Sequence, residues 1–125
     1  MSTTLFLTPG DDFIYTATLT DEAGEAYPLN GCALWFTVKR DKRDDDAAAI
    51  AKLYWVSGGA SSGITVSDPS SGVVAIRMDP ALTDGFVDTS HVWDLQLKDT
   101  GNTYRTVDQG HIAVRPAVTD RLTTP

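Results

Sequence analysis

One stretch of strict alternation, residues 90–98, constrains the fold of this chain more than any other feature. Trp93, Leu95 and Leu97 fall on one side of an extended backbone, and the polar residues between them fall on the other. A period of two is typical of a β-strand with one buried face and one wet face. Residues 99–102 contain Gly101, which can take the positive φ of a short hairpin loop, and a second β-rich run follows at 103–107, which predicts a central hairpin.

The same alternation recurs along most of the chain, interrupted by turns rich in glycine, proline and aspartate. Asp79 and Pro80 favour one helical turn, and Gly110 predicts a bulge or crossover. The number and spacing of the strands predict an all-β, immunoglobulin-like β-sandwich of about seven to nine antiparallel strands. The predicted strands cover residues 5–7, 13–19, 32–38, 49–56, 64–66, 73–78, 90–98, 103–107 and 111–115.

Residues 46–52 leave two interpretations open. A helical turn capped by Asp46 would use the run of alanines that follows it. A strand from about Ala49 would instead continue into the β-rich residues 53–56. The strand is favoured, because the segment is too short to form an independent helix.

Length and charge limit what the chain does. Its 125 residues fit one domain spanning 1–125, with an irregular tail from about residue 117. The 10 basic and 17 acidic residues give a net charge of −7, and aspartates interleave with the basic cluster at residues 39–43, so nucleic acid is not an expected partner. No apolar run is long enough to predict a membrane span. The N-terminus lacks signal-peptide features, and a single Cys32 forms no internal disulfide.

The sequence contains no recognisable catalytic or metal-binding motif. The aspartates within residues 41–46 have the oxygens that calcium prefers, but the pattern of an EF-hand is absent and a solvated loop is favoured. Asp11 and Asp12 are expected to begin a strand, and His91 and His111 are expected to be structural. No Gly-x-Ser-x-Gly motif occurs. These patterns predict a protein that is not an enzyme and needs no metal or cofactor.

Aromatic residues mark the candidate recognition surface. Trp93 belongs to the predicted core, whereas Trp35 alternates with the core residues of its strand and falls on the wetter face. One of Tyr54 or Trp55 falls on that outer face as well. Outward aromatic residues on adjacent strands favour a protein interface that includes Trp35, Tyr54 and Trp55. The alternative is a face that stacks on sugar rings, for which the aromatic residues are Trp35, Tyr54, Trp55, Trp93 and Tyr104.

The order of local signals along the chain resembles that of a known family. It runs through Leu-Thr-Pro-Gly-Asp-Asp at 7–12, Asp-Glu-Ala-Gly at 21–24, Trp-Asp-Leu-Gln-Leu-Lys-Asp-Thr-Gly at 93–101 and Gly-His-Ile-Ala-Val-Arg-Pro at 110–116. This order is similar to that of the immunoglobulin-like domains of tailed-bacteriophage and prophage structural proteins. Within these proteins, the order is similar to that of the N-terminal domain of siphophage baseplate upper proteins.

The resemblance covers about residues 6–119. It implies a non-enzymatic structural or adaptor protein of the virion (tail, baseplate or head-associated) that acts through protein–protein assembly. The implied partners are other virion structural proteins and further copies of the chain in a homo-oligomer. The implied location is the virion, after synthesis in the host cytoplasm without a signal peptide. A carbohydrate-binding or host-adhesion module is the alternative function, motivated by the outward aromatic residues.

Overall fold

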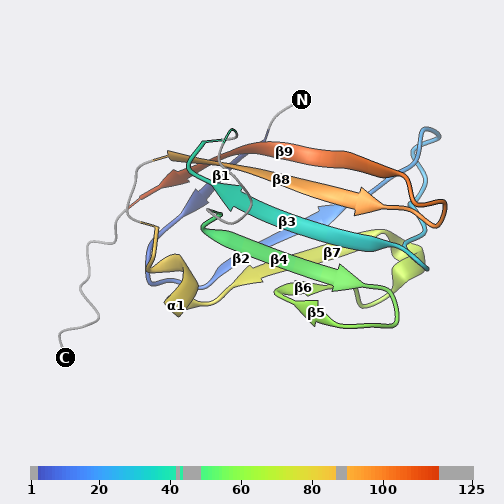
Figure 1. Ribbon diagram of the computed structural model, residues 1–125, viewed down its shortest axis with the longest axis horizontal. Coiled ribbons are helices and arrows are strands. Elements are labelled where there is room, and N and C mark those ends of the chain that lie inside the picture. Colours follow the sequence, from blue (N-terminus) through green and yellow to red (C-terminus); the bar gives the residue numbers. More distant parts are fainter. Residues whose placement is uncertain (1–2, 42, 44–48, 87–89, 116–125) are drawn as a thin grey trace.

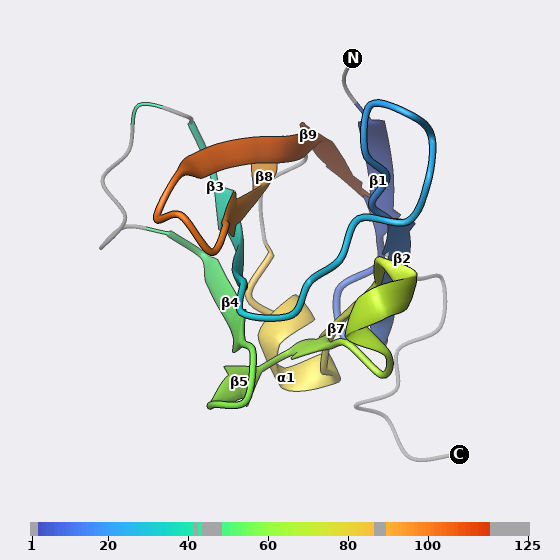
Figure 2. The same cartoon turned by 90° about the vertical axis from the view of Figure 1, so that its right-hand side faces the viewer.

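The computed structural model describes residues 3–41, 43, 49–86 and 90–115 (Figure 1). Nine strands in this part of the chain form two facing sheets, of order β1-β9-β8-β3-β4-β5 and β2-β7-β6 (Figure 2). This is the strand order of a variable-type immunoglobulin domain, and it confirms the predicted all-β sandwich. The strands are β1 (Thr3–Leu7), β2 (Phe13–Thr18), β3 (Ala33–Lys39), β4 (Ala51–Val56), β5 (Ser61–Ser62), β6 (Ile64–Thr65), β7 (Val73–Met78), β8 (Ser90–Lys98) and β9 (Tyr104–Val114).

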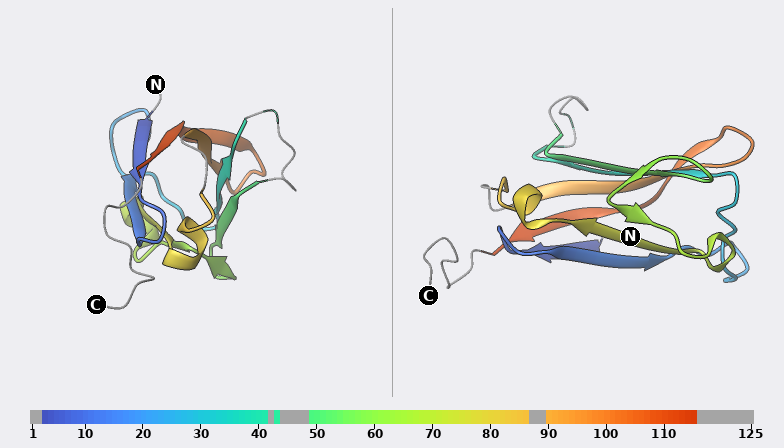
Figure 3. Two further views of the ribbon diagram at one scale, coloured as in Figure 1. Left: turned by 90° about the vertical axis from the view of Figure 1, so that its left-hand side faces the viewer. Right: turned by 90° about the horizontal axis from the view of Figure 1, so that it is seen from below.

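The core lies between the two sheets, which stack as separate layers (Figure 3). Phe36 of β3 and Leu95 of β8 are opposite each other in the larger sheet, and both are fully buried. Trp93 is 3% exposed, and its ring centroid lies 5.4 Å from that of Phe36. Its indole Nε1 donates a hydrogen bond to the backbone oxygen of His111 at 3.2 Å, so the polar end of this buried ring is satisfied. The predicted core face of residues 90–98 is therefore confirmed.

β1 departs from the antiparallel arrangement that the sequence predicted. It pairs in parallel with the second half of β9, with Thr3 opposite Gly110 and Leu7 opposite Val114. After β1 the chain crosses to the other sheet to form β2, so no hairpin forces the two neighbours to run in opposite directions. The predicted edge position of this strand is confirmed, because β1 ends the six-stranded sheet.

Gly110 has a different role from the predicted bulge or crossover. It lies inside β9, which is continuous, and a side chain there would collide with the backbone of Thr3. The glycine therefore lets β1 approach β9 closely. The irregularity in the ladder lies elsewhere, where the register of β8 with β9 shifts between Leu95 and Gln96.

The helical turn predicted at Asp79 is confirmed as α1 (Pro80–Thr83), and Asp79 caps it by accepting a hydrogen bond from the Leu82 amide at 2.9 Å. A 3₁₀ turn, η2 (Pro69–Ser71), precedes β7. The favoured strand interpretation of residues 49–56 is confirmed, although β4 begins at Ala51. The alternative helical turn at residue 46 and the predicted tail from 117 lie outside the described residues. Neither helix of the described part has the length and apolar character needed to cross a membrane.

Candidate interaction surfaces

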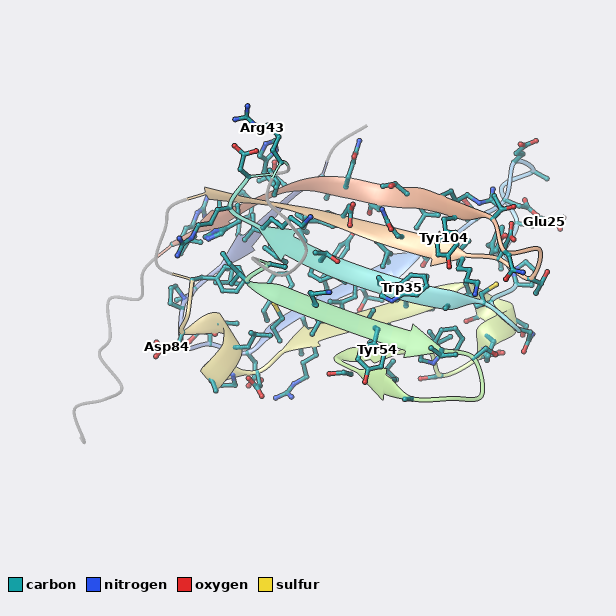
Figure 4. The ribbon with its side chains drawn as sticks, viewed as in Figure 1. Glu25, Trp35, Arg43, Tyr54, Asp84 and Tyr104 are labelled. Carbon is teal, nitrogen blue, oxygen red and sulfur yellow. The ribbon has the colours of Figure 1, made fainter. Side chains whose placement is uncertain are left out.

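Three aromatic side chains on the outer face of the six-stranded sheet form the first candidate surface, the aromatic band: Trp35, Tyr54 and Tyr104 (Figure 4). Trp35 lies opposite Tyr54 across the β3–β4 ladder. On its other side Trp35 stacks with Tyr104, with ring centroids 5.9 Å apart and an interplanar angle of 27°. Tyr54 is 39% exposed and Tyr104 is 60% exposed, so the band contacts solvent across the four neighbouring strands β9, β8, β3 and β4. A contiguous exposed patch of this kind is typical of an interaction site.

The structure resolves the choice between Tyr54 and Trp55. Tyr54 points outward with Trp35, whereas Trp55 lies on the inward side of β4, half-buried against the core together with Leu53. Trp55 is therefore not part of the outer face on which it was expected as an interface residue. Tyr104 was not among the predicted interface residues, although it was among the aromatic residues considered for a sugar-binding face; its position opposite Lys98 in the β8–β9 hairpin places it on the same face as Trp35 and Tyr54.

The outer face around the aromatic band is cationic, although the chain as a whole carries a net charge of −7. The Lys98 ammonium lies 5.7 Å from the centre of the Tyr104 ring, which is a cation–π arrangement. Lys52 and Lys39 lie farther along the same face, so three of the four lysines of the chain gather there. The carboxylate of Asp94 stands among them in the sheet register. An acidic and partly apolar surface would complement this face.

The second candidate surface is an open groove of about 910 Å³ between β2 and β9, the edge groove. It opens beside the first half of β9, because β1 pairs with residues 110–114 and leaves the earlier residues of β9 uncovered within the described part of the chain. No sequence pattern indicated this groove. Its lining consists of residues 15–23, Tyr27, Leu97 and residues 105–108.

Polar contacts define both ends of the edge groove. At the end next to β1, the Tyr15 hydroxyl donates a hydrogen bond to Asp108 Oδ2 at 2.9 Å. Burial, followed by this hydrogen bond and the negative charge of Asp108, raises the pKa of Tyr15 to about 12. At the far end, Arg105 donates to the Tyr27 hydroxyl at 3.0 Å and to Asp99 Oδ2 at 3.3 Å. The Arg105 guanidinium is therefore already hydrogen-bonded within the chain.

The two histidines do not form a common site. His91 is buried on the inward side of β8, with its ring centroid 4.9 Å from that of Phe86. His111 is exposed on β9, opposite Val92, whose side chain belongs to the outer face. The sheet thus separates the two imidazoles. Among the described residues, no cluster of three or more histidine, cysteine, aspartate or glutamate side chains has the geometry of a metal site.

The remaining candidate groups have structural contacts. Asp12 forms an ion pair with Arg77 across the β2–β7 pair. Cys32 is buried, and burial raises the pKa of its thiol. Asp41 Oδ2 lies 3.1 Å from Arg43 Nη2 in an exposed ion pair. The three aspartates that follow at 44–46 lie outside the described residues.

Comparison with known proteins supports the fold and leaves the sequence family open. No family model and no curated protein matches the chain. The natural killer cell receptor Nkp44 superposes with a TM-score of 0.60 at 10% identity, over 92% of this chain and 99% of that one. The N-terminal domain of phage TP901-1 ORF48 gives 0.51 at 10% identity, over 92% and 85%. The PmoD soluble domain from Methylocystis sp. ATCC 49242 (Rockwell) gives 0.51 at 13% identity, over 90% and 77%. These likenesses establish an immunoglobulin-like fold.

Proposed function

We propose that this protein is a non-enzymatic structural or adaptor component of a phage or prophage particle, and that it joins other virion proteins through the aromatic band. The observation that carries the proposal is the stack of the half-buried Trp35 on the exposed Tyr104, continued by the exposed Tyr54, on an open sheet face. Tryptophan and tyrosine are enriched at the energetic centres of protein interfaces, because they bury a large area at little cost in conformational entropy.

Two further observations support a virion context. The order of turns and strands in the sequence resembles that of phage immunoglobulin-like domains, and the fold superposes on the N-terminal domain of phage TP901-1 ORF48. The lysines around the band complement an acidic surface. Other virion proteins and further copies of this acidic chain are the proposed partners, and the virion is the proposed location.

The proposal is tested by substituting one residue of the band. Tyr104→Lys adds a charge at a position that is 60% exposed, so the fold should tolerate it. We expect at least a roughly tenfold loss of binding to purified particles of the phage that encodes the chain, which is the scale of an interface hot spot. Binding is measured by co-sedimentation, and oligomer size by light scattering.

Ile14→Lys is the matched control, because Ile14 is 66% exposed on the outer face of the other sheet. We expect this variant to bind particles within about twofold of the wild type, as surface changes outside an interface do. A wild-type protein that stays strictly monomeric and never joins particles would contradict the proposal. Equal losses for Tyr104→Lys and Ile14→Lys would do the same.

The near-parallel rings of Trp35 and Tyr104 favour one other function, which is stacking against a sugar. Titration with cell-wall polysaccharide distinguishes the two functions, because Trp35 would report ring contact through its fluorescence. We expect no saturable change. A saturable change that Tyr104→Lys abolishes would instead support a carbohydrate-binding module.

A further inference from the structure

The first half of β9 presents an open backbone edge to the edge groove. β8 pairs with one side of β9, and β1 pairs with the other side along residues 110–114. The Asp99 amide donates to the Thr103 oxygen at 3.0 Å, so the next pair of the hairpin, Lys98 and Tyr104, has no backbone hydrogen bonds between its two residues. Successive residues direct their backbone groups to opposite sides of a strand. Tyr104 and Thr106 therefore direct their N–H and C=O groups toward the groove.

β2 presents a second open edge on the other side of the groove, since it ends the three-stranded sheet. The Arg77 amide of β7 donates to the Gly63 oxygen at 2.8 Å, away from β2. Arg77 lies opposite Ile14, so these two residues form a pair without backbone hydrogen bonds between them. Hydrogen-bonded and non-hydrogen-bonded pairs alternate along the ladder, so the pairs of Thr16 and Thr18 with β7 are also without such bonds. The backbone groups of Thr16 and Thr18 point to the side of the groove.

We propose that the edge groove binds an extended segment of a partner protein, which adds as a strand to the free half of β9. Unpaired strand edges are templates for strand addition, in which main-chain hydrogen bonds supply affinity and side-chain pockets supply specificity. The lining runs along residues 15–20 of the β2 side. At about 3.3 Å per residue, such a stretch matches a segment of roughly six residues.

The charge of the groove specifies the segment further. Its lining holds three carboxylates, Asp21, Glu22 and Asp108, against one guanidinium, that of Arg105. Arg105 is already bound to Asp99. A segment with a lysine or arginine near the turn that holds Asp21 and Glu22 would complement this lining. Alternating threonine and valine would suit a groove that is wet on one side and apolar on the other.

This inference deepens the proposed function and rests on it for the protein nature of the partner. The aromatic band and the edge groove lie on different sides of the sandwich. One face would hold one neighbour, while the groove would capture a strand of another. A domain with two such surfaces could link two neighbouring proteins, which is the role of an adaptor.

The probe for the test is the capped peptide acetyl-Lys-Thr-Val-Thr-Val-Thr-Val-amide, added to the full chain. We expect saturable NMR shifts at residues 15–20 and 104–108, and slowed amide exchange at Tyr104 and Thr106. Replacing the lysine of the peptide by glutamate should weaken binding at least tenfold. Glu22→Gln in the protein should weaken binding of the lysine peptide roughly threefold.

Thr106→Pro and Thr106→Ala form a matched pair. Proline removes the edge N–H and is tolerated on edge strands, whereas alanine retains the N–H. We expect the proline variant to lose at least tenfold in peptide affinity and the alanine variant to remain within twofold of the wild type. Where Thr106→Pro does not fold, Glu22→Gln and the glutamate peptide test the same claim on folded protein.

Three results would overturn the inference. They are the absence of shifts at the groove, equal affinities for the lysine and glutamate peptides, or edge protection that needs no peptide and rises with protein concentration. The last result would identify a second copy as the occupant. Tyr104→Lys is avoided here because residue 104 borders both surfaces. Tyr54→Lys should weaken particle binding at least roughly tenfold and leave peptide binding unchanged, so failure of the proposed function and failure of the groove are separable.

Discussion

At the scale of single residues, Gly110 determines whether β1 can join the sheet. A Cβ at this position would overlap the backbone of Thr3, which is its partner in the parallel ladder. We expect Gly110→Ala to destabilise the fold by about 1–3 kcal/mol, as overpacking does, because the start of β1 must move away. Urea unfolding measures the loss, and hydrogen exchange should show reduced protection in β1.

Gly101→Ala is the control for this prediction. The new Cβ would lie 3.4 Å from Asp99 Oδ1, which is an ordinary contact. The positive φ that the sequence predicted for Gly101 belongs instead to Asn102, at 61°, so an alanine at position 101 is not strained. We expect a change within about 0.5 kcal/mol. A Gly110→Ala variant as stable as Gly101→Ala, with β1 still protected, would show that the close approach of β1 is not required.

Tyr15 makes stability depend on pH in the alkaline range. Burial and the contact with Asp108 raise the pKa of Tyr15 from 10.0 to about 12 in the folded protein. The folded state thus holds the phenolic proton more tightly than the unfolded chain, so this stabilisation is complete below pH 10 and is lost between pH 10 and about 12. We expect the difference in urea midpoint between wild type and Tyr15→Phe to shrink over that window. A difference that stays constant with pH would refute the assignment to Tyr15.

At the scale of elements, one buried hydroxyl fixes α1 to the connection between β1 and β2. Thr83 is fully buried, accepts a hydrogen bond from the Gly10 amide at 3.0 Å and donates one to the Asp11 backbone oxygen at 2.7 Å. The helix thereby holds the connection between β1 and β2. We expect Thr83→Val to destabilise the fold by about 1–3 kcal/mol, because the Gly10 amide loses its partner in a partly buried site. Thr65→Val, at an exposed position of β6, should change stability by less than about 0.5 kcal/mol in the same chemical denaturation.

The strands themselves were predictable, whereas one pairing was not. Alternation around Leu95 and Phe36 identifies buried faces, because the side-chain period of a strand is the same wherever it lies in a sheet. For the same reason alternation carries no information on direction, and the parallel partner of β1 had to come from the structure. Gly110 was recognised as unusual, but a glycine in a strand indicates a bulge and a close backbone approach equally well.

The candidate surfaces were predictable in part. Trp35 lies between two buried residues of β3, so its outward direction follows from the sequence. Residues 53–56 are all apolar or aromatic, so the sequence does not show which of them point inward. Tyr54 and Trp55 were therefore not distinguishable as the outward residue. The outward direction of Tyr104 follows only from the register of the β8–β9 hairpin, which places this residue opposite Lys98. The edge groove depends on the point where β1 meets β9, which no local pattern encodes.

At the scale of the whole molecule, one core serves both sheets and therefore both surfaces. Buried residues of β8 and β7, such as Leu95 and Ile76, belong to the same cluster. A domain with a single core is expected to unfold in one cooperative step. We expect Leu95→Ala to cost about 2–5 kcal/mol, with the same midpoint whether unfolding is followed by tryptophan fluorescence or by far-UV circular dichroism.

Val73→Ala, at a position that is 39% exposed, is the control and should shift the midpoint little. If the two probes gave different midpoints for Leu95→Ala, the sheets would be separate folding units and the two surfaces would not share one support. If the two midpoints coincide, Leu95→Ala should weaken particle binding and peptide binding together at urea concentrations near its unfolding midpoint. Tyr54→Lys, a change in the aromatic band away from the edge groove, should weaken only particle binding, and a change in the edge groove should weaken only peptide binding. That contrast distinguishes an adaptor with two independent surfaces on one rigid core from a single extended interface.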